Sequence, residues 1–322
     1  MLFLEEMPER TSNFARFAWF TLAYNLVVIL WGVFLRASYS GDGCGQHWVT
    51  CQGEVIPSAP ELKTVIEFSH RISTVLAGFI VIALVVWAFR AFDRGSWGRK
   101  TAVLSLFFII VEGLIGRGLV LTGNVAANWT PSRPYWTAGH LINTFVLLAF
   151  LALTAWLTNK APTPVLNVSK KALVLIVIGL FAILVVGVSG SMAALTNMLF
   201  PSASLTEGIA KDFDASSHYL LRLRVSHPIL SIITAVYLIF LSGWLRTWSG
   251  DVPTVTRWAN ILSVLVIAQL AFGAATLLTL APIIMQLGHL LLADSVWISF
   301  VLLAASYLTS SEADPLKESV SS

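Results

Sequence analysis

Four histidines near the starts of long apolar runs are the first candidates for chemistry in this sequence. They are His70, His140, His227 and His289. An imidazole inside a lipid-spanning helix is costly unless it faces a bundle interior and finds a partner there, so each histidine is a candidate functional group. One such histidine is often only hydrogen-bonded to a neighbouring helix. Four at repeated positions indicate a ligand set.

Two imidazoles on facing helices are the usual protein contribution to a six-coordinate heme, whose flat apolar ring suits the interior of a helix bundle. We therefore expect His70 to pair with His140, and His227 with His289. Zinc or copper is the alternative, but the apolar runs offer neither cysteines nor clustered carboxylates to complete such a site. The sequence favours heme.

Arginines gather at the same ends of the apolar runs as the histidines. They are Arg36, Arg71, Arg117, Arg222 and Arg224. Heme propionates are anions, and arginine binds carboxylates through two parallel hydrogen bonds. The alternative is that these side chains reach toward lipid head groups. Their concentration near the histidines favours propionates.

The elements that must position these residues are transmembrane helices. Of the 322 residues, 57% are hydrophobic and only 11% are charged, with a mean hydropathy of +0.79, which excludes a water-soluble globule. The apolar runs are long enough to cross a bilayer core of roughly 30 Å. We predict an all-α membrane protein with eight transmembrane helices at 15–36, 65–90, 101–122, 136–157, 171–192, 219–245, 255–280 and 284–308.

An even number of helices places both termini on one side of the membrane. Most lysines and arginines of the short loops fall on that side, which predicts cytoplasmic termini. The head of the chain lacks an Arg-rich presequence and carries Glu5, Glu6 and Glu9, so we expect a bacterial plasma membrane. The net charge of +3 mostly reflects this orientation, and no nucleic-acid partner is expected.

The two parts of the chain repeat one another. Ser-His at His70 recurs at His227, an offset of 227 − 70 = 157, and Gly-His-Leu at His140 recurs at His289, an offset of 289 − 140 = 149. We predict two tandem, pseudo-symmetric four-helix bundles, residues 1–158 and 159–322. Inverted-repeat transport is disfavoured, because halves with an even number of helices keep the same orientation.

Three features distinguish the first half from the second. Glu67 lies one helical turn before His70 on the same face, where the second half has Arg224. A carboxylate beside a heme can relay protons or stabilise a developing cation, although an ion pair with Arg71 is a structural alternative. The second feature is Glu112, where the second half has Gln269; its role is open.

The third feature is a pair of cysteines, Cys44 and Cys51, in the glycine-rich first outer loop. That side of the membrane is oxidising, so a disulfide is expected. A small, exposed bridge of this kind suits redox chemistry, and a structural bridge is the alternative.

With these residues, the chain resembles the heme A synthase family over nearly its whole length. The similarity rests on Glu-Phe-Ser-His-Arg at 67–71, on Gly-His-Leu at His140, on His227, on His289 followed by Ala293 and Trp297, and on cysteines seven residues apart. The resemblance implies oxidation of a ring methyl of heme O to a formyl group, giving heme A for aa-type respiratory oxidases. It also implies heme O synthase, the protoheme farnesyltransferase, as a partner, with an electron acceptor that is not identified.

The resemblance further implies a role for each motif residue. Glu67 would be the catalytic carboxylate, and His70 with His140 would hold the substrate heme. His227 with His289 would hold a resident heme B. The bridge between Cys44 and Cys51 would take part in electron transfer.

The main alternative is a diheme electron carrier of the cytochrome b kind. Such a carrier also needs four histidines on a bundle. It gives no reason for Glu67, the cysteine loop or the inequality of the halves. A carrier would also place its hemes in opposite leaflets, whereas the helix directions place all four histidines near one side.

Overall fold

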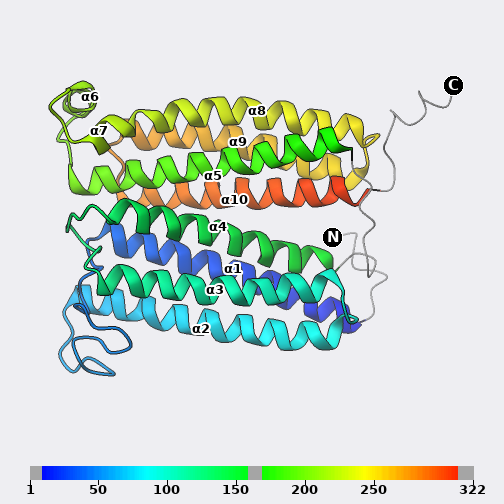
Figure 1. The fold of residues 1–322 in the computed structure, drawn as a ribbon, viewed down its shortest axis with the longest axis horizontal. Coiled ribbons are helices and arrows are strands. Elements are labelled where there is room, and N and C mark those ends of the chain that lie inside the picture. Colours follow the sequence, from blue (N-terminus) through cyan, green and yellow to red (C-terminus); the bar gives the residue numbers. More distant parts are fainter. Residues whose placement is uncertain (1–8, 159–168, 311–322) are drawn as a thin grey trace.

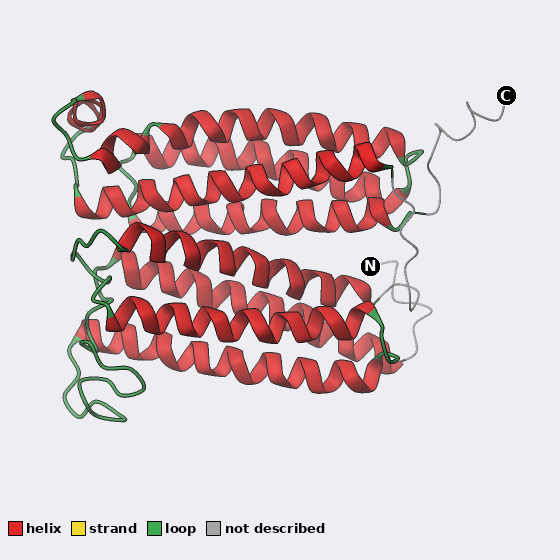
Figure 2. Cartoon of the chain, viewed as in Figure 1, coloured by secondary structure: helices red, strands yellow, loops and turns green. Residues whose placement is uncertain are grey.

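The computed structural model describes residues 9–158 and 169–310, and every element named in these ranges is a helix (Figure 2). The helices long and apolar enough to span a membrane number eight in this part of the chain, as predicted. In chain order the helices are α1 (Glu9–Ala37), α2 (Leu62–Ala91), α3 (Trp97–Leu121), α4 (Arg133–Leu157), α5 (Lys170–Leu199), α6 (Leu205–Phe213), α7 (Tyr219–Arg224), α8 (Ser226–Trp248), α9 (Pro253–Leu278) and α10 (Ile283–Leu308).

Two details differ from the sequence prediction. The sixth spanning segment consists of two helices, α7 and α8, which meet at Val225. The amphipathic helix α6 was not predicted, although Ser204 and Glu207 have the spacing of a helix-capping box. In the structure the Ser204 hydroxyl accepts a hydrogen bond from the Glu207 amide at 3.2 Å.

The spanning helices form two groups (Figure 1). In the first group α2 and α4 each pack against α1 and α3, so α2 and α4 lie diagonally across the bundle. In the second group α8 and α10 each pack against α5 and α9, and are diagonal in the same way. The helices that carry the four histidines are therefore the diagonal pairs, with the bundle interior between them.

The two groups meet through α4 and α10. The apolar segments of these two helices are 61% and 56% buried, against at most 33% for the other spanning helices, so they form the middle layer. There the rings of Phe145 and Trp297 stack at 5.2 Å, and the Trp297 indole donates a hydrogen bond to the Phe145 carbonyl at 2.6 Å. Asp294 is fully buried nearby along α10, and neither of its carboxylate oxygens has a hydrogen-bond partner among the described residues.

The four histidines lie at a common depth near one end of the molecule. The spanning helices that carry them all begin at the end from which α2 starts (Figure 1). His70 is 70 − 62 = 8 residues into α2, and His289 is 289 − 283 = 6 residues into α10. At about 1.5 Å of rise per residue, both lie roughly 10 Å along their helices.

Candidate active site

The imidazoles of His227 on α8 and His289 on α10 face one another across the second bundle. Their ring centroids are 6.3 Å apart and their planes cross at 87°. Two imidazoles that bind one metal ion from opposite sides, with metal–nitrogen bonds of about 2 Å, have centroids about 6 Å apart. The Ser189 hydroxyl lies 3.0 Å from His227 Nδ1, which leaves Nε2 for a metal. The pair fits the axial ligation of a heme.

Glycines on neighbouring helices let the histidine rings lie close to the backbone. A methyl group added at Gly190 would lie 2.8 Å from Cε1 of His227, and one at Gly273 would lie 2.8 Å from Cε1 of His289. In the first bundle, a methyl at Gly32 would lie 3.0 Å from Cε1 of His70. The three histidine rings fit at these positions only because the glycines have no side chain.

The contact between a glycine and the first histidine of a pair occurs in both bundles. On α1 the glycine is Gly32, which lies against His70, and on α5 it is Gly190, which lies against His227. The repeat thus extends to the first and fifth spanning helices at the level of ring packing.

In the first bundle the histidines are placed differently from their counterparts. The Nδ1 atom of His70 on α2 is buried and has no hydrogen-bond partner among the described residues. The Nδ1 atom of His140 on α4 lies 3.0 Å from Oε1 of Glu112 on α3. A methyl at Gly116, the repeat counterpart of Gly273, would meet nothing within 4 Å. The surroundings of His140 are therefore more open than those of His289.

Glu67 connects the histidine helix α2 to the first outer loop. This side chain is only 3% exposed, and its Oε2 accepts a hydrogen bond from the Cys44 amide at 2.8 Å. Its Oε1 accepts two from Arg71, at 2.6 and 3.2 Å. The ion pair that the sequence offered as a structural alternative is therefore present. The Glu67 carboxylate lies one helical turn from His70 and is hydrogen-bonded to the backbone of the disulfide loop.

The predicted disulfide between Cys44 and Cys51 is present. The prediction that it is exposed was wrong, because Cys44 is 0% and Cys51 is 1% exposed. The loop packs so tightly on the start of α2 that a methyl at Gly43 would lie 2.4 Å from the Lys63 carbonyl. Burial of the bridge follows from this packing, which the sequence spacing alone does not specify.

Four of the five arginines proposed for propionates have protein partners among the described residues: Arg36, Arg71, Arg117 and Arg224. Besides Glu67, Arg71 donates to the His47 and Thr50 carbonyls at 2.8 and 3.0 Å. The guanidinium of Arg117 lies over the Trp48 ring at 5.1 Å. Arg71 and Arg117 thus both hold the first outer loop.

The other two arginines act at the second bundle. Arg36 on α1 donates a hydrogen bond to the side-chain oxygen of Gln286 at 3.4 Å. Arg36 thus reaches from the first bundle to α10, the helix that carries His289. Arg224 donates to Asp212 at 2.6 Å and to Asn197 at 2.5 Å, which ties α7 to α6 and α5. Contact of any of these arginines with a propionate stays a prediction.

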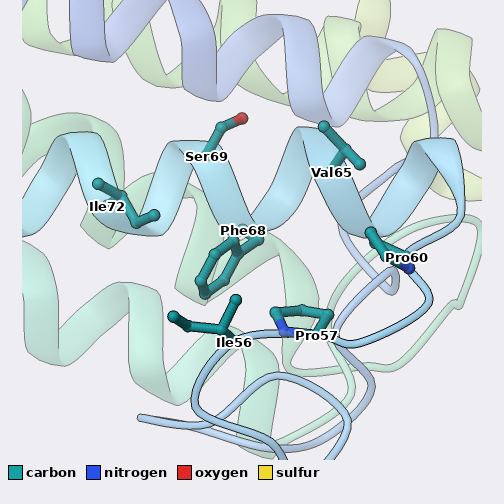
Figure 3. A pocket seen from close by; sticks show the side chains of 7 residues that line it. All are labelled: Ile56, Pro57, Pro60, Val65, Phe68, Ser69 and Ile72. Atoms are coloured by element: carbon teal, nitrogen blue, oxygen red, sulfur yellow. The ribbon is translucent and has the colours of Figure 1, made fainter.

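Figure 3 shows an apolar pocket beside this site, between the first loop and the face of α2 that carries Val65, Phe68 and Ile72. Its volume is about 200 Å³. Pockets for drug-sized ligands have roughly 300–1,000 Å³, so it is too small for a heme. The histidines are not among its lining residues, which places it outside the site described above.

Sequence reasoning missed three polar residues of the site. Ser189 lies against His227, Gln286 against Arg36, and Asn143 beside Glu112. Asn143 and Gln286 each stand three residues from a candidate ligand, His140 and His289 respectively, a spacing that places them on the same helix face. That spacing was the available signal, whereas Ser189 comes from another helix and had none.

Comparison with known proteins places this arrangement in a family. The sequence profile of the family described as cytochrome oxidase assembly protein (COX15-CtaA) matches residues 15–301. The protein of Halalkalibacterium halodurans named heme A synthase is 32% identical over 273 residues, covering 83% of this chain and 88% of that protein. The heme A synthase of Alkalihalophilus pseudofirmus is 28% identical over 289 residues, covering 88% of this chain and 92% of that protein.

A longer relative matches more strongly. A protein of Thermus thermophilus named protoheme IX farnesyltransferase is 42% identical over 297 residues, which are 92% of this chain but 49% of that protein. The chain thus spans about half the length of the Thermus relatives. With a family profile over nearly its whole length, this chain belongs to the heme A synthase family of cytochrome oxidase assembly proteins.

Proposed function

We propose that this protein is a heme A synthase, an oxidoreductase that converts the ring methyl of heme O to the formyl group of heme A for aa-type respiratory oxidases. The observation that carries the proposal is the inequality of two otherwise equivalent histidine pairs. The first pair is accompanied by Glu67, the disulfide loop and an open space at Gly116, and the second by glycines closely packed on both rings. An exchanging substrate suits the first site, and a resident group suits the second.

In this proposal the first half, residues 1–158, binds the substrate heme between His70 and His140. The second half, residues 159–322, holds a resident heme B between His227 and His289. When bound there, heme B supplies one-electron transfer to the neighbouring site. The close glycine contacts at Gly190 and Gly273 support tight retention, since they fix the planes of both rings.

Glu67 is the acid–base group of the proposal. Its carboxylate lies one turn from His70, and the backbone amide of Cys44 and the guanidinium of Arg71 hold it in place. A carboxylate fixed in this way can accept the proton released when a methyl carbon is hydroxylated. Its hydrogen bond to Cys44 connects it to the bridge with Cys51, which we assign to electron transfer from the site.

The position in the cell and the partners follow from the same proposal. We infer a bacterial plasma membrane with both termini cytoplasmic, which puts the histidine ends of the helices and the disulfide loop on the oxidising outer side. The partner that supplies the substrate is heme O synthase. The farnesyltransferase name of the Thermus relatives, which are about twice as long as this chain, supports a close association of the two activities.

The test is to express this chain with heme O synthase, purify it in detergent, and separate the extracted hemes by chromatography with mass detection. The matched control is the same cells with the His70→Ala variant. Heme A that appears with the unchanged chain and is lost in the variant is the expected result. Heme B alone, reversibly reduced and without heme A, would instead indicate the diheme electron carrier.

A further inference from the structure

Two residues at repeat positions, Glu112 and Gln269, approach the second histidine of each pair. They are 269 − 112 = 157 residues apart, the same offset as His70 and His227. Glu112 Oε1 lies 3.0 Å from Nδ1 of His140. The Gln269 amide nitrogen is 3.5 Å from Nε2 of His289, at the limit of a hydrogen bond, whereas Nδ1 of His289 has no hydrogen-bond partner among the described residues. One histidine thus has an acidic neighbour, and its counterpart has a neutral one.

The first bundle holds the Glu112 carboxylate in a fixed position beside His140. Asn143 on α4 donates to its Oε2 at 2.6 Å and the Thr144 hydroxyl donates to its Oε1. Asn143 also donates to the Phe108 carbonyl at 2.9 Å, which fixes its amide group. These two donors fix the carboxylate, whose Oε1 lies at ion-pair distance from Nδ1 of His140.

The second bundle lacks these donors. His140 and His289 are 149 residues apart. The same offset relates Asn143 to Leu292 and Thr144 to Ala293, neither of which has a donor in its side chain. The Gln269 side-chain oxygen is buried and has no hydrogen-bond partner among the described residues. The difference is therefore a group of three side chains rather than one substitution.

A carboxylate that accepts the Nδ1 proton of a ligand histidine fixes the ring tautomer and raises the basicity of Nε2. A more strongly donating axial ligand stabilises the ferric state of a heme relative to the ferrous state. We propose that Glu112 is a positioning residue that turns His140 into a strongly donating ligand and thereby lowers the reduction potential of the heme in the first half. The inference rests on the proposed binding of heme by His70 and His140.

The test is a spectroelectrochemical titration of the purified protein expressed with heme O synthase, with the reduction of each heme followed separately. In Glu112→Gln the reduction equilibrium constant of one heme should rise at least tenfold, about 59 mV for one electron, while the other heme is unmoved. Thr144→Val keeps the carboxylate but removes one donor, so it should shift the first heme less than Glu112→Gln.

The outcomes separate this inference from the proposed function. Two retained hemes with unmoved potentials in Glu112→Gln overturn the inference alone. If Glu112→Gln loses its heme, Thr144→Val decides: a raised potential of the first heme supports the inference, and an unchanged or lowered one overturns it. Loss of heme from both variants assigns Glu112 and Thr144 a purely structural role and overturns it as well. If the protein without substitutions contains no heme in its first half, the proposed function itself is refuted.

Discussion

Replacing Gly273 by alanine should release the heme of the second half, while the same change at Gly116 should not. The added methyl at Gly273 would lie 2.8 Å from Cε1 of His289, and ordinary contacts begin at 3.4 Å, so the ring must move by 3.4 − 2.8 = 0.6 Å. Binding geometries must be held to within about 0.5 Å. A displacement of this size in the support of a metal ligand typically costs 10–100-fold in affinity.

Gly116→Ala is the matched control, because it stands at the repeat position and its methyl would meet nothing within 4 Å. Both changes replace glycine by alanine inside a helix, which favours the helix by roughly 1 kcal/mol, so neither should unfold the protein. The assay is heme per protein by pyridine hemochrome, together with the melting temperature. Gly273→Ala should hold one heme fewer than Gly116→Ala. Equal heme contents would refute the packing argument.

Three further predictions concern single groups of the site and core. Glu67→Gln should keep both hemes but lower heme A formation by about 100-fold or more, measured by heme extraction; full activity would remove the carboxylate from the proposal. Joint replacement of Cys44 and Cys51 by alanine should lower turnover at unchanged heme content, and unaltered turnover would make the bridge structural. Asp294→Leu should raise the melting temperature in detergent, because it removes a buried carboxylate without hydrogen-bond partners among the described residues. Asp294→Asn should raise it less because it keeps polar atoms, and a lowered temperature in both variants would indicate a partner or function for this carboxylate.

The helix count and the candidate histidines were readable from the sequence because both depend on short-range patterns. A run of about 20 apolar residues must cross the bilayer as a helix, whatever its neighbours are. A polar ring in such a run has few acceptable environments, which made His70 and His227 visible as functional candidates. The helix α6 was missed because its 9 residues lie outside the long apolar runs on which the prediction was based, although its amphipathic pattern and its capping box were readable.

The membrane fold, the sequence repeat and the choice of the four histidines as candidate ligands could be read from the amino-acid order alone, since lipid imposes its constraints one helix at a time. How the side chains meet across helices became visible only in the packed bundle. It joined Glu67 to Cys44, buried the disulfide, and set Glu112 against His140. These contacts depend on helix rotation and crossing, which shift a side chain by several ångströms without changing the hydrophobic pattern of any one helix. The pairings between helices therefore belong to the packed bundle.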